Sequence, residues 1–356
     1  MASISLCMIV KNEEKVLDRC LKSIYKACDE IIIVDTGSTD STIDIAKKYT
    51  NKIYQFEWVD DFSKARNYSF SKATKDYILW LDADDVVSSV NLKKIIDLKD
   101  KIDFSVDIYM FKYDILFDES GKSTYSYFRE RLLKRSVGYI WKDPVHECIE
   151  LTGSVEKIDI AINHKKSVEK YSNRNLLIYE KLLINNKLTP RQQFYYAREL
   201  YYNSKINKAI KEFKKFLKSD GAWVENKISA SIDLANCFIL KKDYLSALNC
   251  LIETFKFSTP RAEVLCLIGK IYQFQNNYYE AIIWYKLARN LDVDLTTNGF
   301  YNLDSNGFIP CIELCVCYYR IGDIVSAKYY NKLAGKFKPN NSSYLHNKEF
   351  LDNIKD

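Results

Sequence analysis

Short apolar runs rich in β-branched residues alternate with helical patterns over the first hundred residues, and this alternation constrains the fold most strongly. Apolar strands separated by helices are typical of a parallel sheet that is covered on both faces. The expected strands are Ile4–Val10, Glu30–Asp35, a short one around Ile53, and Tyr77–Leu81. The expected helices are Glu14–Ala27, a segment ending near Tyr49, and Phe62–Lys72. A sheet of this kind binds ligands beyond the carboxyl ends of its strands.

The pattern changes between about Val106 and His164, where aromatic residues alternate with polar ones. Alternation with a period of two predicts strands, and we expect antiparallel pairs here. An irregular stretch, residues 139–147, interrupts them. The N-terminal part is therefore predicted to be an α/β domain with a mixed, Rossmann-like sheet.

Small residues recur at fixed points in the helical sequence that follows Lys165. Four alanines each lie twelve residues after another small residue, so the small residues form four pairs. In each pair, a large residue lies three positions after the first small residue. The pairs are Ala197 and Ala209, Ala235 and Ala247, Gly269 and Ala281, and Cys315 and Ala327. Their interval of roughly 40 residues is near the 34-residue tetratricopeptide period, and the unit Ala262–Asn290 fits best. An ordinary helical bundle is the alternative.

Composition excludes several classes of protein. Lys and Arg number 53 against 47 Asp and Glu, and a net charge of +6 permits an acidic ligand without demanding nucleic acid. No apolar stretch approaches the roughly 20 residues of a membrane span, and the N-terminus does not resemble a signal peptide. Most of the ten cysteines lie in apolar runs, as reduced thiols do. We therefore expect a cytoplasmic protein, with homodimerisation through Cys311–Tyr319 as an option.

The segment Asp82-Ala83-Asp84-Asp85 is the strongest chemical signal, because three carboxylates follow a buried strand directly. Carboxylates so close together repel one another, and a divalent cation removes that cost. Oxygen ligands completed by water and phosphate fit Mg²⁺ or Mn²⁺. The alternative is an acidic turn that caps the next helix.

Two further strands end in polar groups. Asp35 ends the second strand and precedes the turn Thr36-Gly37-Ser38-Thr39-Asp40, and Asn12-Glu13-Glu14 follows the first strand. Gly37 permits a tight turn, and Ser or Thr can cap the helix that follows. Helix caps could explain any one of these groups, but three strand ends with a carboxylate cluster predict a binding site.

Four segments in this order, SLCMIVKNEE, EIIIVDTGSTDST, DDFSKARN and ILWLDADD, resemble the family 2 inverting glycosyltransferases, whose fold is called GT-A. The resemblance covers about residues 3–165. A glycosyltransferase domain followed by tetratricopeptide-like repeats is similar to bacterial enzymes that glycosylate peptides and proteins, such as glycocin S-glycosyltransferases and flagellin-modifying enzymes. The processive synthases of the family differ, since this chain has no Q-x-x-R-W motif.

The resemblance implies a role for each matching residue. The nucleotide-sugar would contact, in chain order, Val10, Asn12, Glu13, Asp35, Arg66, Asp82 and Ala83. Within this set, Asp35 would bind the uracil, Arg66 the base or the phosphates, and Asp82 the ribose. Asp84 would bind a metal that bridges the diphosphate, with His164 as an extra ligand.

An inverting transferase also needs a base that deprotonates the acceptor. Glu147 is the preferred candidate because the triplet V-H-E matches the peptide-modifying relatives, and Asp143 is the alternative base. His146 would contact phosphate or metal. A structural alternative remains, in which Glu147 pairs with Arg129 or Arg131.

The sequence thus predicts a GT-A domain at 1–168, a connecting helix at 169–189, tetratricopeptide-like repeats at 190–340 and a tail at 341–356. The predicted function is metal-dependent transfer of a sugar, GlcNAc or glucose, from a UDP-sugar to a Ser, Thr or Cys side chain of a polypeptide. The helical repeats would engage that polypeptide. Two alternatives stay open, namely a surface glycan or lipid-linked saccharide as acceptor, and a non-catalytic repeat scaffold.

Overall fold

The computed structural model describes residues 1–117, 121, 123–165, 173–185, 187–292 and 302–354. Two compact units are distinguished, one made of Met1–Phe117 with Ser126–Lys181 and the other of Asp118–Tyr125 with Leu182–Asp356. Among the described residues, no helix combines the length and apolarity needed to cross a membrane. The helix α5 (Arg174–Asn185) falls within the predicted connecting segment 169–189, of which residues 169–172 and 186 lie outside the described residues.

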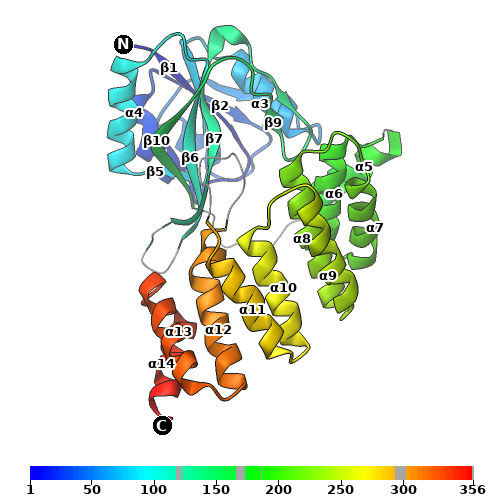
Figure 1. The fold of residues 1–356 in the computed structure, drawn as a ribbon. Helices are drawn as coiled ribbons and strands as arrows, with labels where there is room; N and C mark the ends of the chain where they lie inside the picture. The colour runs from blue at the N-terminus through cyan, green and yellow to red at the C-terminus, as the bar shows by residue number, and fades with distance from the viewer. Residues whose placement is uncertain (118–120, 122, 166–172, 186, 293–301, 355–356) are drawn as a thin grey trace. The chain divides into compact units, whose positions relative to one another are not determined.

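An eight-stranded sheet forms the centre of the first unit (Figure 1). Its strands, in spatial order, are β3 (Ile53–Gln55), β2 (Glu30–Asp35), β1 (Ile4–Val10), β4 (Tyr77–Trp80), β7 (Ser123–Lys134), β6 (Ile108–Phe117), β10 (Val155–His164) and β5 (Asp85–Val87). Strand β1 runs parallel to both β2 and β4, and β2 runs parallel to β3. The prediction of a parallel sheet for the first part of the chain is confirmed.

The later strands join this sheet in both directions. Strand β7 is antiparallel to β4, and β5 is antiparallel to β10. Strands β6 and β10 run parallel, with Tyr113 opposite Ile162, so this region contains parallel as well as antiparallel pairs. Alternation in the sequence tells which residues share a face, but it does not tell which strand lies next or in which direction. The irregular stretch contains a small antiparallel pair, β8 (Trp141–Lys142) and β9 (Cys148–Ile149).

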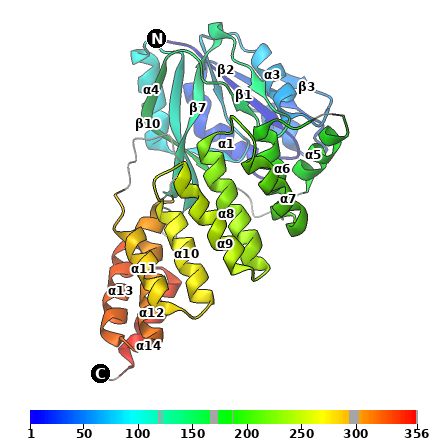
Figure 2. The same cartoon turned by 45° about the vertical axis from the view of Figure 1, so that its right-hand side comes forward.

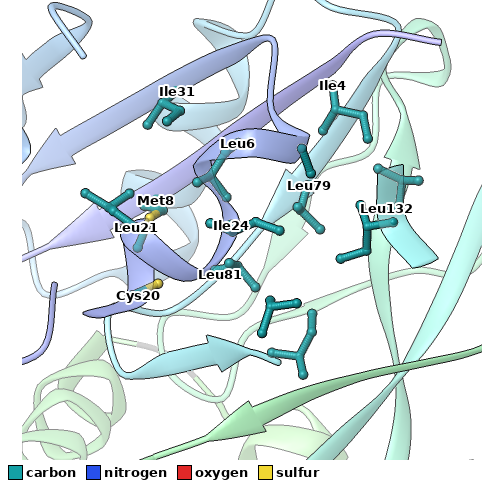
Figure 3. Packing of buried hydrophobic residues seen from close by; sticks show 14 of the residues in the cluster. Ile4, Leu6, Met8, Cys20, Leu21, Ile24, Ile31, Leu79, Leu81 and Leu132 are labelled. Carbon is teal, nitrogen blue, oxygen red and sulfur yellow. The ribbon is translucent and has the colours of Figure 1, made fainter. Parts of the chain in front are cut away.

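Helices pack on both faces of β1. On one face, α1 (Leu17–Ile24) contributes Cys20, Leu21 and Ile24 to a core with Leu6 and Met8 (Figure 3). Residues that alternate with these, such as Cys7, join a second core to which α3 (Phe62–Ser71) contributes. Burial of alternate side chains on opposite faces explains why β1 is apolar at nearly every position.

The second unit consists of antiparallel helix pairs (Figure 2). The pairs are α6 (Pro190–Tyr202) with α7 (Ile206–Leu217), α8 (Val224–Leu240) with α9 (Tyr244–Ile252), α10 (Ala262–Phe274) with α11 (Tyr278–Arg289), and α12 (Phe308–Arg320) with α13 (Ile324–Phe337). The small residues at the predicted repeat positions are buried, and a Cβ added to Gly269 would lie 3.1 Å from the ring of Tyr285. Small side chains therefore allow the paired helices to approach closely.

The turn within each pair repeats the same backbone geometry. One residue has a left-handed conformation in every pair, and these residues are Ser204 (φ 59°), Lys242 (φ 60°), Asn276 (φ 58°) and Gly322 (φ 83°). The backbone amide of the residue that follows donates a hydrogen bond to the carbonyl of the large residue of the predicted repeat pattern. Examples are the hydrogen bonds from Asp243 to Phe238 and from Asn277 to Tyr272. This hydrogen bond closes the end of the first helix. The repeated geometry confirms tetratricopeptide-like repeats.

The segment predicted as a tail, 341–356, is helical over α14 (Ser342–Asp352). Its Leu351 packs with Cys315 and Ala327 in one apolar cluster. Burial of this apolar side chain against a neighbouring helix favours the helical conformation of the segment.

Candidate functional site

The parallel strands β1, β2 and β4 bring their carboxyl ends to one edge of the sheet. Val10 and Asp35 are opposite each other in the register. The loops that follow are tied together, because the amide of Thr39 donates to Oδ1 of Asn12 at 2.8 Å and the amide of Glu13 donates to Oγ1 of Thr42 at 2.7 Å. The predicted nucleoside loop is therefore held against the loop after β2.

The buried carboxylate of Asp35 shapes the turn that follows it. It accepts hydrogen bonds from the amides of Gly37 at 3.2 Å and Ser38 at 3.1 Å. Gly37 has φ 101°, a conformation that other residues adopt only at a cost. A carboxylate offers about four acceptor positions, so these bonds leave acceptor capacity at Asp35. Its predicted contact with uracil stays a prediction.

The three carboxylates after β4 have different surroundings. Asp85 is 0% exposed, whereas the side chains of Asp82 and Asp84 are 34% and 20% exposed. Asp85 accepts from the amide of Asp82 at 3.0 Å, and its Oδ2 lies 3.1 Å from an Nη of Arg131. The repulsion that the sequence suggests is thus partly neutralised by a buried arginine.

Asp84, Asp85 and His164 form the group best suited to hold a cation within the described residues. Their ligand atoms all lie within 4.8 Å of one another. Strands β5 and β10 create this arrangement, because Asp85 is opposite His164 in their antiparallel register. Carboxylate and imidazole donors suit Mn²⁺ or Mg²⁺, so the residues fit the predicted metal. The structure brings Asp84 and His164 together as predicted, and it adds Asp85.

The electrostatics of His164 reflect these neighbours. Burial lowers the pKa of His164, but hydrogen bonds and charge from Asp84 and Asp85 outweigh burial and raise it from 6.5 to about 9. Its Nδ1 lies 3.3 Å from Oδ1 of Asp84 and 3.2 Å from Oδ1 of Asp85. Positive charge is therefore favoured where the predicted cation would bind.

The guanidinium of Arg66 links two predicted site residues. An Nη of Arg66 lies 2.7 Å from Oδ1 of Asp82, and Nε lies 2.6 Å from Oε1 of Glu147. Arg66 also lies against the rings of Trp80 and Trp141, with its guanidinium carbon 5.0 Å and 4.9 Å from their centroids. Burial lowers the pKa of Arg66, but the two carboxylates raise it well above its usual range. The arginine therefore stays charged and holds both carboxylates in place.

The proposed base Glu147 is 13% exposed and pairs with Arg66. The structural alternative named Arg129 or Arg131, but Arg129 pairs with Glu130 and Arg131 with Asp85. Asp143 and His146 lie in the turn between β8 and β9, and both have positive φ, at 73° and 53°. His146 stacks on Tyr179, with 6.5 Å between the ring centroids, and is not a member of the cation group described above.

The sequence did not single out Asp85 as a ligand or Tyr113 at all, and Arg131 was considered only as a partner of Glu147. Tyr113 donates to Oδ1 of Asp85 at 2.9 Å, and Arg131 donates to the carbonyl of Trp80 at 3.0 Å. Both residues come from strands whose position beside the acidic turn depends on the strand order. Arg131 directly follows Arg129 and Glu130, so no local signal in the sequence distinguishes it from its neighbours.

Residues 5–150 match the family model described as "Glycosyl transferase family 2". A TPR repeat-containing protein of Synechococcus elongatus is 36% identical over 151 residues, which are 42% of this chain and 36% of that protein. The SPbeta prophage-derived glycosyltransferase SunS of Bacillus subtilis is 26% identical over 274 residues, 73% of this chain and 64% of SunS. The chain thus spans less than two thirds of the length of either relative.

Parts of the chain are similar to solved structures that include a TPR protein and a glucosyl-3-phosphoglycerate synthase. The TPR protein YrrB has a TM-score of 0.37 and 14% identity, covering 49% of this chain and 81% of YrrB. Glucosyl-3-phosphoglycerate synthase from Mycobacterium tuberculosis has a TM-score of 0.28 and 18% identity, covering 32% of this chain and 44% of that one. Both scores fall below 0.5, too low for either structure to inform the site.

Proposed function

We propose, from the premise that the N-terminal domain belongs to glycosyl transferase family 2, that this protein moves a sugar from a UDP-sugar to a polypeptide side chain. The sugar would be GlcNAc or glucose, and the acceptor a Ser, Thr or Cys. The observation that carries the proposal is the pair Asp82 and Asp84, partly exposed at the carboxyl end of β4. Ligands bind at this edge in sheets of this kind.

In this proposal the donor lies across the ends of β1, β2 and β4. Asp35 would accept from the uracil, and the loop Val10–Glu13 would line the nucleoside. Asp82 and Ala83 would lie beside the ribose. Support comes from the hydrogen bonds that join the loops after β1 and β2, because loops held in advance lose less entropy on binding.

Asp84 would hold the metal, Mn²⁺ or Mg²⁺, with His164 and Asp85 beside it. A bound divalent cation offsets the negative charge that grows on the leaving diphosphate. The protein contributes two further positive groups near this charge, since Arg66 and Arg131 pair with Asp82 and Asp85. These arginines balance the acidic turn and keep Asp84 available for the cation.

Glu147 would act as the base. As the acceptor oxygen forms its bond to the anomeric carbon, its proton would pass to the Glu147 carboxylate. The bond from that carbon to the diphosphate oxygen breaks, and UDP leaves with the electron pair. Before this step, Arg66 holds the Glu147 carboxylate in place through the ion pair from its Nε. Asp143 is the alternative base, and a thiol acceptor needs a base less.

The polypeptide acceptor would be engaged by the helical repeats. Arrays of helix pairs expose extended surfaces that commonly bind peptides. A surface glycan or a lipid-linked saccharide is the competing acceptor. Protease digestion of labelled material separates the two, because it would remove the label from a polypeptide and spare it on a saccharide.

The first test is UDP release from UDP-GlcNAc and UDP-glucose with Mn²⁺. We expect the wild type to release UDP from one donor and Asp84→Ala to be slower by about 100-fold or more, since the cation stabilises the leaving group. Asp159→Ala is the matched control, because Asp159 is an exposed aspartate that binds Lys94 and Lys112. No release by metal-loaded wild type with any donor and acceptor would contradict the proposal and favour the scaffold alternative.

A further inference from the structure

Two residues of the loop between β8 and β9 have a left-handed backbone, which is uncommon outside glycine. Asp143 has a φ angle of 73° and His146 one of 53°. His146 directly precedes the proposed base Glu147, so its backbone helps to set the direction of the Glu147 side chain. Such conformations persist where surrounding contacts hold them, and they are frequent at functional sites. The contacts that hold this loop therefore decide where the proposed base lies.

The helix α3 holds the two ends of the loop. Asn67 forms two hydrogen bonds with the backbone of Trp141, since its Oδ1 accepts from the amide at 2.8 Å and its Nδ2 donates to the carbonyl at 3.0 Å. The neighbouring Arg66 forms the ion pair with Glu147. Residues 141 and 147 are thus both bound to one turn of α3.

The connecting helix α5 contacts the residues just before Glu147. The hydroxyl of Tyr179 donates to the carbonyl of Val145 at 3.3 Å. The ring of Tyr179 stacks on that of His146, with 17° between the two planes. Tyr179 is 0% exposed, so its side chain is held by packing as well as by these contacts. The proposed mechanism assigns no task to this tyrosine.

We propose that Tyr179 is a positioning residue, which holds Val145 and His146 so that the Glu147 carboxylate stays where the base is needed. The inference rests on the proposed function, in which Glu147 takes the proton of the acceptor. Tyr179 acts through the loop and does not touch the reacting groups. Its effect can still be large, because a displacement of about 1 Å in a catalytic group can slow a reaction about 100-fold.

Further contacts join α5, the loop and the start of α3. The amide of Phe62 donates to the carbonyl of Pro144 at 2.9 Å. The guanidinium carbon of Arg174 on α5 lies 4.6 Å from the centroid of the Phe62 ring, and Lys181 pairs with Asp60. Each of the three segments therefore contacts the other two. This mutual support keeps Tyr179 fixed relative to the loop.

The test compares two buried tyrosines of the first unit. Tyr179→Phe removes the hydroxyl and keeps the ring. Tyr77→Phe is the matched control, because Tyr77 is also 0% exposed and its hydroxyl donates to a backbone carbonyl, that of Val106, at 2.9 Å. We expect Tyr179→Phe to slow UDP release from the preferred donor, with water as acceptor, by about tenfold. Tyr77→Phe should stay within about twofold of wild type, and the Kd of UDP with Mn²⁺ should change in neither variant.

Hydrogen exchange of the full chain, without donor, measures the loop independently of sugar transfer. We expect amides of residues 143–149 to exchange about fivefold faster in Tyr179→Phe, since one hydrogen bond that opposes local opening is lost. The same amides should be unchanged in Tyr77→Phe. Equal exchange in wild type and Tyr179→Phe would overturn the inference and leave the proposed transferase intact.

A double-mutant cycle separates positioning of the base from a general loss of structure. If Tyr179 acts through Glu147, Tyr179→Phe slows UDP release in the wild type but has no further effect in Glu147→Gln. Equal slowing in both backgrounds, unchanged UDP release, or weaker binding of UDP in place of a slower rate would overturn the inference. Absence of UDP release by the wild type with any donor would contradict the proposed function, and the role of Tyr179 in catalysis would be overturned with it.

Discussion

Single residues at the candidate site serve two tasks at once, and Arg66 is the clearest case. Its guanidinium reaches Asp82 with one nitrogen and Glu147 with another, and it lies against two indole rings. The planar, forked shape of a guanidinium makes both contacts possible, whereas a lysine ammonium is a compact point charge. Arg66 therefore connects the donor side of the proposed site with the proposed base.

Arg66→Lys tests this connection while keeping the charge. We expect the variant to lose about 1–3 kcal/mol of stability, because one partly buried carboxylate is left without its partner. Its rate of UDP release should fall by at least about tenfold as Glu147 is released from its position. Urea unfolding and initial rates measure the two effects. Arg135→Lys, at an exposed arginine, should change neither, and an unaltered Arg66→Lys would show that the bridge is dispensable.

Elements of the sheet are joined at the opposite edge by another buried carboxylate. Glu30 begins β2 and accepts from Ser5 on β1 at 2.5 Å, from the amide of Thr74 at 2.9 Å, and from Lys52. Burial raises the pKa of Glu30, but the hydrogen bonds from these partners outweigh burial and lower it from 4.5 to about 2. The ionised carboxylate thus holds together the starts of two strands and the segment before β4.

Glu30→Gln tests the contribution of this charge as a function of pH. Because the folded pKa is below the unfolded value of 4.5, the stabilisation is present above that pH and disappears as the pH falls toward 2. We expect the variant to be less stable by about 1–2 kcal/mol at pH 7, and the difference to shrink below pH 4.5. Hydrogen exchange of the β1 and β2 amides measures this difference in stability between the variant and the wild type. Glu156→Gln, at an exposed glutamate, is the control. A stability difference that does not change with pH would contradict the role assigned to the ionised Glu30 carboxylate.

Helices and strands could be predicted from the sequence where the local residue pattern determines their position. The strands β1 and β2 and the small residues of the repeats could be located because apolar periodicity and spacing are local properties. The cluster at Asp85, Tyr113 and His164 could not be predicted in full. It depends on β10 lying between β6 and β5, a strand order that brings together residues far apart in the chain. Arg66 was expected to contact the donor. Its ion pair with Glu147 could not be predicted, because Glu147 lies in a loop without hydrophobic periodicity.

The whole molecule combines two units with different architecture, and each has its own core. The first unit has apolar clusters on both faces of its sheet. The second contains the helix pairs, with buried small residues at the contact between paired helices. Domains with separate cores commonly unfold in separate steps. A ligand of the proposed donor site should therefore act on one unit more than on the other.

Binding of UDP with Mn²⁺ should stabilise the first unit selectively. At a ligand concentration of 100 times Kd, the expected gain is about 2.7 kcal/mol, since only the folded unit binds. Hydrogen exchange measured by mass spectrometry should show added protection in β1, β2 and β4 and little change in α10–α13. Asp84→Ala should abolish the added protection, whereas Asp159→Ala should keep it. Equal protection of the helix pairs would mean that the ligand couples the two units, and the proposed donor site would then involve more of the chain than the sheet edge.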